Sequence, residues 1–161
     1  MCKILTFLFS YLSPNYILCY IIIVKGVNNL QKTYIMFKPD AIEKQIVGEL
    51  ITRMEQANYK IEDIKLMNLD KNLLEEHYAH IVDKPFFPEI VEYLQRGPVI
   101  GMIVSGVNVI EGMREMMGAT DPAEAAEGTI RAIHGTNKTE NVIHGSDSVA
   151  NAEVEIKRFF G

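Results

Sequence analysis

The chain has few of the residues that define several common classes of protein. Its 161 residues include two cysteines, Cys2 and Cys19, no tryptophan, and only six prolines and eleven glycines, which are scattered. Two cysteines cannot form a disulfide scaffold, and no Cys-x-x-Cys pair indicates a metal site. A disordered or collagen-like chain is also excluded, because 48% of the residues are apolar and only 23% are charged. The length and composition are those of one ordinary globular domain.

Excess positive charge and the common nucleotide-binding motifs are absent as well. The formal net charge of −5 argues against nucleic acid as a partner over a large surface, although a small basic pocket for an anion is compatible with it. The sequence contains no GxxxxGK[ST] loop, no GxGxxG fingerprint, no HExxH and no kinase catalytic loop. If the protein binds nucleotides, it must therefore bind their phosphates with a motif other than these.

The beginning of the chain differs from the rest, because residues 4–24 carry no charge. A membrane anchor would be barely long enough and would contain Ser13-Pro14-Asn15 in its middle. A secretory signal would explain Lys3 and the apolar stretch, but no Ala-x-Ala-like cleavage site follows. The third interpretation, which we favour, is a start site assigned too far upstream. We therefore predict a hydrophobic N-terminal extension at residues 1–32 and a folded domain at residues 33–161.

Apolar residues of the folded domain recur with the periods of strands and helices in turn. Strands are predicted at residues 33–38, 59–69, 99–104 and 141–144, and helices at residues 40–54, 73–81, 86–94, 110–117 and 148–159. Asp40 to Glu43 has the spacing of a capping box, and residues 119–140 show little periodicity. The order predicts an α/β fold, an α+β sandwich, and fits a ferredoxin-like βαββαβ antiparallel sheet covered by helices.

Among four histidines, His144 is the candidate nucleophile. It lies at the end of the last predicted strand, directly before Gly145, which would let a ligand approach. Ser146 follows as a hydroxyl close to anything bound at the imidazole. Glu155 on the next predicted helix could fold back and fix which ring nitrogen carries the proton.

Three cations could accompany this histidine. Lys38 ends the first strand, Arg114 lies on a predicted helix, and Arg131 lies in the aperiodic stretch. Each alone would be an ordinary solvated residue, but together they indicate a clamp for an anion, because arginine pairs phosphate oxygens bidentately. Tyr78 and Phe86 are possible aromatic platforms.

The octapeptide Asn141-Val142-Ile143-His144-Gly145-Ser146-Asp147-Ser148 resembles the active-site signature of nucleoside diphosphate kinases. Further segments match that family in order and spacing: Lys38-Pro39-Asp40, His77-Tyr78, Lys84-Pro85-Phe86-Phe87, Ser105-Gly106, Gly118-Ala119-Thr120-Asp121-Pro122, Gly128-Thr129-Ile130-Arg131 and Phe159-Phe160. The resemblance covers residues 33–161.

The resemblance implies a phosphotransferase with a ping-pong reaction. A nucleoside triphosphate, typically ATP, would give its γ-phosphoryl to His144, which would pass it to a nucleoside diphosphate. Mg²⁺ would bridge the phosphates without a direct protein ligand, with Asp147 contacting it at most through water. The family also implies a homo-oligomer, a tetramer or a hexamer, in the cytoplasm, or at a membrane if residues 4–24 are a genuine anchor.

The resemblance also assigns roles to side chains. The residues that would contact phosphates or the transferring phosphoryl are Lys38, His77, Arg114, Thr120 and Arg131. The residues that would contact the sugar or the base are Lys38 and Asn141 for the ribose, with Phe86 stacking on the base and Ile90 nearby. The residues that would act in catalysis are His144, Lys38, Tyr78, Ser146 and Glu155. Stacking reads the face of a base and not its edge, so broad base tolerance is implied.

The sequence departs from the family pattern after Arg131. Ile133 stands where relatives have an acidic residue that ties down the long loop, so loop order and subunit contacts are expected to differ. His134 is expected to be a surface or aromatic substitute. Lys138 lies where relatives often have an apolar residue near the base. The alternative hypothesis is a catalytically weak relative that binds nucleotides or a partner, against which the intact set of polar residues argues.

Overall fold

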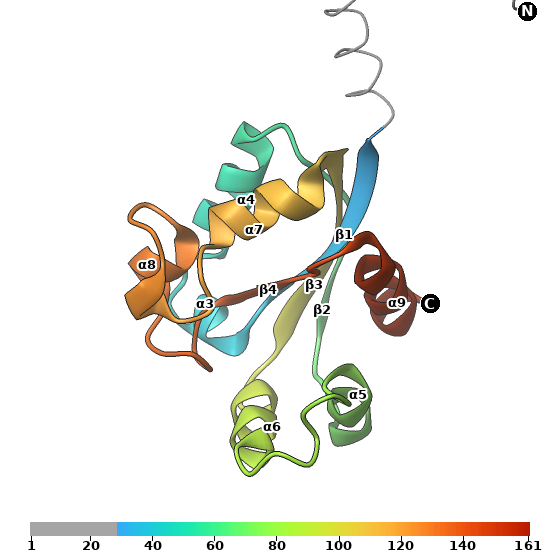
Figure 1. The fold of residues 1–161 in the computed structure, drawn as a ribbon, viewed down its shortest axis with the longest axis vertical. Helices are drawn as coiled ribbons and strands as arrows, with labels where there is room; N and C mark the ends of the chain where they lie inside the picture. The colour runs from blue at the N-terminus through green and yellow to red at the C-terminus, as the bar shows by residue number, and fades with distance from the viewer. Residues whose placement is uncertain (1–28) are drawn as a thin grey trace, which may run out of the picture. The chain divides into compact units, whose positions relative to one another are not determined.

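The four predicted strands, β1 (Leu30–Phe37), β2 (Lys60–Met67), β3 (Val99–Val107) and β4 (Ile143–Gly145), form one sheet (Figure 1). The structure is a computed structural model, and it describes residues 29–161. The strand order is β2-β3-β1-β4, with antiparallel pairing of β2 with β3 and of β1 with β4. This order, with helices in the connections, confirms the predicted ferredoxin-like fold.

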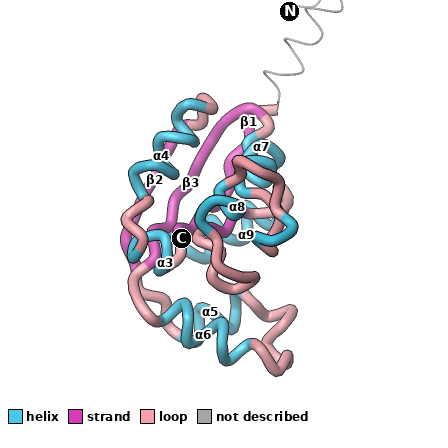
Figure 2. Tube along the Cα trace, turned by 90° about the vertical axis from the view of Figure 1, so that its left-hand side faces the viewer, coloured by secondary structure: helices cyan, strands magenta, loops and turns pink. Residues whose placement is uncertain are grey.

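Helices cover both faces of the sheet. They are α3 (Pro39–Glu43), α4 (Val47–Gln56), α5 (Lys71–His77), α6 (Phe87–Gln95), α7 (Val109–Met117), α8 (Ile130–His134) and α9 (Val149–Phe160). α4 and α7 pack on one face, whereas α5, α6 and α9 contribute to the core on the other (Figures 1 and 2).

Strand β1 lies between β3 and β4 and supplies both cores. Successive side chains of a strand point to opposite faces of its sheet. Accordingly, Ile35 and Phe37 pack in the core under α4 and α7, and Tyr34 and Met36 pack in the core with α6 and α9. Because each face carries its own apolar cluster, the second half of β1 is buried on both sides, and Tyr34 to Phe37 form an unbroken apolar run.

The connection after β1 differs from the prediction. The single helix expected at residues 40–54 is broken into α3 and α4, and Gln45 between them has a left-handed φ of 57°. The capping box predicted at Asp40 is wrong, because the N-cap is Lys38 and has no side-chain cap. The buried Asp40 carboxylate instead bonds to groups far along the chain.

The aperiodic stretch is more ordered than its composition suggests. It contains a short 3-10 turn, Pro122–Glu124, and the helix α8, neither of which the periodicity predicted. Other predicted boundaries are confirmed: the Ser148 hydroxyl caps α9 by accepting from the Asn151 N–H at 3.2 Å, and Gly118 ends α7 at a φ of 80°.

The hydrophobic residues 4–24 lie outside the described part of the chain, so the three interpretations of them stay predictions. Within residues 29–161, no helix is both long enough and apolar enough to cross a membrane. Strand β1 begins at Leu30, three residues before the predicted start of the first strand.

Candidate active site

One cavity of about 480 Å³ collects most of the predicted site residues. Those that line it are Lys38, His77, Tyr78, Ile90, Arg114, Thr120, Arg131, Asn141, His144, Asp147 and Glu155. Ser146 is buried beneath it and bonds to a lining residue. Phe86 does not line it, and 49% of this residue is exposed at the start of α6. Side chains from the residue that follows β1 and from α5, α6, α7, α8, β4 and α9 therefore converge on one space.

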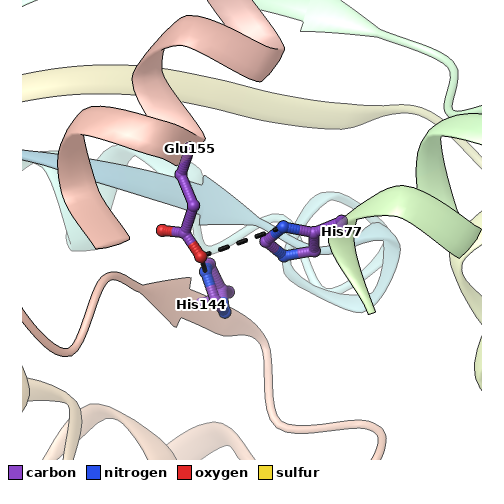
Figure 3. Close-up of side chains that lie close together, drawn as sticks. All are labelled: His77, His144 and Glu155. Carbon is purple, nitrogen blue, oxygen red and sulfur yellow. Dashed lines mark hydrogen bonds and ion pairs between the residues drawn. The ribbon is translucent and has the colours of Figure 1, made fainter. Parts of the chain in front are cut away.

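Strand pairing holds His144 in place. His144 in β4 is registered opposite Met36 in β1. Its Nε2 lies 3.1 Å from Oε1 of Glu155 on α9 (Figure 3). Since an ionised carboxylate can only accept a hydrogen bond, Nε2 carries the proton and donates it to Glu155, and the nitrogen left for chemistry is Nδ1. The predicted orienting partner of the histidine is thus in hydrogen-bond contact with it.

A second hydrogen bond fixes the Glu155 carboxylate. Oε2 of Glu155 accepts a 2.5 Å bond from the Ser146 hydroxyl, and Ser146 Oγ accepts from the Tyr34 N–H of β1 at 3.2 Å. Burial raises the pKa of Glu155, but the hydrogen bonds from His144 and Ser146 and the nearby imidazole charge outweigh it and lower the pKa overall. The carboxylate is therefore ionised near neutral pH and can stabilise a cationic imidazole.

His77, the last residue of α5, stands beside this pair. Its ring centroid lies 4.9 Å from that of His144, and its Nδ1 lies 3.8 Å from Oε1 of Glu155 (Figure 3). Burial, followed by the charge of His144, lowers the pKa of His77 to about 3. His77 is thus neutral, and its Nε2 has no hydrogen-bond partner among residues 29–161. A phosphate contact here would use a neutral N–H and not a cation.

Lys38 is the most buried cation of the cavity. Its Nζ donates to Oδ1 of Asn141 at 2.6 Å and to the Thr139 carbonyl at 3.0 Å. Burial and the charge of Arg131 lower the pKa of Lys38 to about 7, with Asp40 opposing the shift. The Lys38 side chain therefore gains or loses its proton close to physiological pH, and an anion in the cavity would favour its charged form.

The two arginines differ in whether their guanidinium groups bond to the protein backbone or face the cavity. Arg131 donates from Nη1 to the Gly118 carbonyl at 2.8 Å and from Nη2 to the Ile143 carbonyl at 2.9 Å. Burial and the charge of Arg114 lower the pKa of Arg131 to about 10, so it stays charged near neutral pH. Arg114 on α7 is exposed at the cavity. Arg131 thus fixes the loop and β4 together, whereas Arg114 is available to a ligand.

Asn141 and Tyr78 also help to build the cavity wall. The Asn141 amide donates to the carbonyls of Thr120 at 2.9 Å and Lys138 at 2.8 Å, while its oxygen accepts from Lys38. Its predicted contact with a sugar would therefore require an exchange of partners. The Tyr78 side chain meets the ring of His77 edge-on, and burial followed by the charge of Glu155 raises the pKa of its hydroxyl.

Asp40 and Tyr93 are two supporting residues that the sequence analysis missed. Val142, two residues before His144, has a left-handed φ of 63°, which is strained for a β-branched residue. Asp40 Oδ2 accepts from the Val142 N–H at 3.2 Å, and Asp40 Oδ1 accepts from the Tyr93 hydroxyl at 2.5 Å. The closeness of Asp40 to Lys38 in the sequence is a signal for this role, but the spacing of Asp40 and Glu43 predicts a helix cap instead.

His134 supplies a tie for the loop whose usual acidic residue is replaced by Ile133. His134 Nε2 lies 3.1 Å from Oε1 of Glu49 on α4, and Lys44 donates to the His134 carbonyl at 2.6 Å. Ile133 itself is exposed. Helix α8, which carries Arg131, is thus held to the α4 side of the molecule by contacts that differ from those expected of relatives.

Comparison with known proteins agrees with the geometry of this cavity. The profile of the family described as nucleoside diphosphate kinase matches residues 31–161. The chain belongs to the nucleoside diphosphate kinase family. The resemblance predicted from the octapeptide is thereby confirmed, and the roles of individual side chains stay predictions.

Individual relatives are similar over nearly the whole folded part. The nucleoside diphosphate kinase of Acetivibrio thermocellus is 47% identical over 131 residues, which are 81% of this chain and 96% of the relative. The solved structure of the Aquifex aeolicus nucleoside diphosphate kinase superposes with a TM-score of 0.78 at 37% identity, covering 82% of this chain and 96% of that one. The Halobacterium salinarum nucleoside diphosphate kinase, solved in complex with CDP, gives a TM-score of 0.78 at 40% identity, with coverages of 81% and 87%.

Proposed function

We propose that this member of the family transfers the γ-phosphoryl of a nucleoside triphosphate to a nucleoside diphosphate through phosphorylated His144. The observation that carries the proposal is the contact of His144 Nε2 with the ionised Glu155 at 3.1 Å, in a cavity that Lys38 and Arg114 also line. A histidine held by one nitrogen presents the other as a nucleophile. Positive groups around it stabilise the transferring phosphoryl.

The first half-reaction forms one bond and breaks one. The lone pair of His144 Nδ1 attacks the γ-phosphorus, and the bond from that phosphorus to the bridging oxygen breaks, so that a nucleoside diphosphate leaves. The phosphorylated ring keeps its proton on Nε2, where the charge of Glu155 stabilises it. In the second half-reaction a terminal phosphate oxygen of another nucleoside diphosphate takes the phosphoryl, and Nδ1 recovers its lone pair.

The remaining lining residues support a nucleotide arranged along the cavity. Lys38, Arg114 and Arg131 supply positive charge for the phosphates, with Thr120 and His77 beside them. The polar groups of Asn141 suit the ribose hydroxyls, and the apolar side chain of Ile90 suits a base. Stacking of the base on Phe86 would require this residue to turn toward the cavity, because it is exposed outside it.

We propose Mg²⁺ as the metal ion that accompanies the nucleotide. The residues present fit an ion held by phosphates, because most of the charged groups at the cavity are cations and oxygen ligands are few. Asp147 is exposed at the cavity, and the hydrogen bond from Asn151 lowers the pKa of its carboxyl, so it can contact the ion through water. Mg²⁺ would supply charge neutralisation on the phosphates.

We also propose that the chain forms a homo-oligomer. Strand β2 is an edge of the sheet, and its side chains Ile64 and Leu66 are 48% and 65% exposed. Exposed apolar side chains on an edge strand mark a surface where another chain can pair. Sedimentation of the wild type and of Leu66→Lys tests this: the variant should shift toward monomer, and a wild type that is already monomeric would refute the proposal. The same measurement separates a tetramer from a hexamer.

The proposed compartment is the cytoplasm, with a membrane location only if residues 4–24 are an anchor. Mass spectrometry of the N-terminal peptide of the purified protein tests this. A first peptide beginning near residue 30 would refute the anchor, and a membrane-associated protein that retains residues 4–24 would refute the upstream-start interpretation.

Labelling tests the enzymatic proposal directly. Incubation with ATP labelled at the γ-phosphoryl should give a protein label that is labile in acid and stable in alkali, as expected of phosphohistidine. His144→Ala should lose the label with an unchanged circular dichroism spectrum, and the matched variant His80→Ala, which changes an exposed histidine at the same cavity, should retain it. Nucleotide binding without any label in the wild type would favour the alternative, a relative that binds nucleotides and does not transfer phosphoryl groups.

A further inference from the structure

We propose that His77, His144 and Glu155 form a zinc-binding site in the nucleotide-free protein, and that zinc bound there prevents phosphorylation of His144. The inhibition rests on the proposed function, whereas the binding site rests only on the arrangement of three donor groups. One ligand atom from each residue can be chosen so that all three atoms lie within 4.8 Å of one another. Figure 3 shows the three side chains turned toward a common point.

The distances are close to those of a zinc site. Zinc takes imidazole nitrogen and carboxylate oxygen at about 2.0–2.2 Å, so two ligands of a tetrahedral ion lie about 3.3 Å apart. Here Glu155 Oε1 lies 3.1 Å from His144 Nε2 and 3.8 Å from His77 Nδ1. His77 must therefore move closer to Glu155 as well as to His144 for all three atoms to bind one ion. Two histidines and one carboxylate with a fourth position open are a ligand set that zinc uses in catalytic sites.

The chemistry of the donors selects against the metal of the reaction. Mg²⁺ prefers an octahedral shell of oxygen atoms, and two imidazole nitrogens suit zinc or a similar transition metal. The fourth position would face the cavity, where water could occupy it. The cluster is therefore distinct in ligand type from an ion carried by nucleotide phosphates, although both would use the same cavity.

Zinc bound at this site would make His144 unable to act as a nucleophile, although the residue itself stays in place. Binding to His144 Nε2 displaces the proton that this nitrogen shares with Glu155. The proton moves to Nδ1, whose lone pair then no longer attacks phosphorus. Glu155 becomes a zinc ligand and can no longer stabilise the phosphorylated ring. The bound metal would thus exchange the tautomer of the histidine, and removal of the metal by a chelator would restore it.

One neighbouring group opposes the metal. Nη1 of Arg158 lies 3.4 Å from His77 Nδ1, and the Arg158 side chain is held by Glu76, whose carboxylate accepts from Nε at 2.9 Å. A cation so close to a ligand atom lowers the affinity for zinc and must turn aside. Variants at this arginine and at the histidine should therefore change zinc binding in opposite directions.

The binding test uses Zn²⁺ alone with the nucleotide-free full chain, in competition with a chromophoric chelator. We expect one equivalent of zinc per chain. His77→Gln should weaken this binding at least about tenfold, since even an indirect partner of a metal ligand contributes that much. Arg158→Met should strengthen it, and His80→Ala, a matched control at the same cavity, should leave it unchanged. Binding that His77→Gln leaves unchanged would refute the site.

A second measurement on the wild type does not depend on the folding of any variant. Co²⁺ in place of zinc should give the intense visible absorption of a tetrahedral ion with nitrogen ligands, and equimolar Zn²⁺ should abolish it. Weak absorption typical of an octahedral ion would refute the proposed geometry.

The kinetic arm measures the rate of His144 labelling against the concentration of Zn²⁺ at constant Mg²⁺ and ATP. Labelling should fall as the site fills and recover with chelator, and His77→Gln should shift the inhibition to higher zinc by the same factor as its binding. Absence of labelling in zinc-free wild type would refute the proposed function and leave the binding result standing. Zinc binding without inhibition would refute the inhibitory half of the inference.

Discussion

Replacing Glu155 by glutamine tests whether the charge of this carboxylate, and not only its shape, supports phosphorylation of His144. The carboxylate accepts from His144 Nε2 at 3.1 Å and from the Ser146 hydroxyl at 2.5 Å. In Glu155→Gln the amide oxygen can still face His144, and its NH₂ group can donate to Ser146 Oγ. The Ser146 hydroxyl would then donate to the Tyr34 carbonyl, which lies 3.4 Å away. The variant therefore keeps the hydrogen bonds and loses the negative charge.

The expected magnitude follows from the strength of the two kinds of bond. A hydrogen bond to a charged acceptor contributes about 1.5–3 kcal/mol and a neutral one about 0.5–1.5 kcal/mol. The difference of about 1–2 kcal/mol acts where the ring is cationic, in the phosphorylated state, and corresponds to labelling slowed about 5- to 30-fold. Glu155→Ala removes the whole bond and should slow labelling about 10- to 200-fold.

Rapid-quench labelling with γ-labelled ATP measures these rates, and urea unfolding checks that each variant is folded. Glu153→Gln is the matched control, because it removes the same charge from an exposed position of the same helix. The pKa of Glu155 lies below its ordinary 4.5, so its contribution to stability is present above about pH 4.5 and is lost as the pH falls through the lowered pKa. Glu155→Gln should lack this acid-side loss. Labelling by Glu155→Gln at the rate of Glu153→Gln would refute the reasoning.

Three further predictions concern the surroundings of the histidine. The pKa of Lys38 is about 7 against an ordinary 10.5, so between these pH values the folded state binds fewer protons than the unfolded state, and the free energy of unfolding should rise with pH from 7 to 10.5 by up to about 5 kcal/mol. Lys38→Met should lack this rise in urea unfolding, and an equal dependence of the free energy of unfolding on pH in the two proteins would contradict the prediction. Tyr93→Phe should lower the free energy of unfolding in urea by about 1.5–3 kcal/mol, because Asp40 loses a hydrogen bond and holds the Val142 N–H less firmly. A loss below about 0.5 kcal/mol would count against a supporting role for the contacts of Asp40 with Tyr93 and Val142. Phe86→Ala should raise KM for purine and pyrimidine diphosphates alike by about 5- to 150-fold if the base stacks there, and an unchanged KM would exclude stacking.

The sheet and the main reacting groups could be predicted from sequence because their signals are local. The apolar runs of β1 and β3 mark strands buried in the interior, and His144 stands next to such a run. Lys38, directly after β1, is identified in the same way. His144 and Lys38 could be predicted because the strand in or beside which each residue lies also sets the position of its side chain at the cavity.

The supporting contacts could not be predicted, because they join residues far apart in the chain. Asp40 satisfies the spacing of a helix cap, but its partner Tyr93 is 53 residues away and draws the carboxylate into the core. The break at Gln45, where φ is 57°, is likewise not predicted by the periodicity, which continues through it. The helix α8 is too short for a hydrophobic period to be visible and is held by contacts to α4.

The register of β1 against β4 has a consequence for how the protein tolerates change. Met36 is registered opposite His144, and Lys38, directly after β1, donates its backbone N–H to the Val142 carbonyl at 2.9 Å, so the reactive ring and the ammonium lie on adjacent, hydrogen-bonded segments. Their separation is set by the spacing of the backbone ladder and not by any helix that covers it. Substitutions or thermal motion in the outer layers can alter access to the cavity and leave the distance between nucleophile and charge intact. Selection can therefore vary the rim of the cavity, as at Lys138, while the reacting pair keeps its geometry.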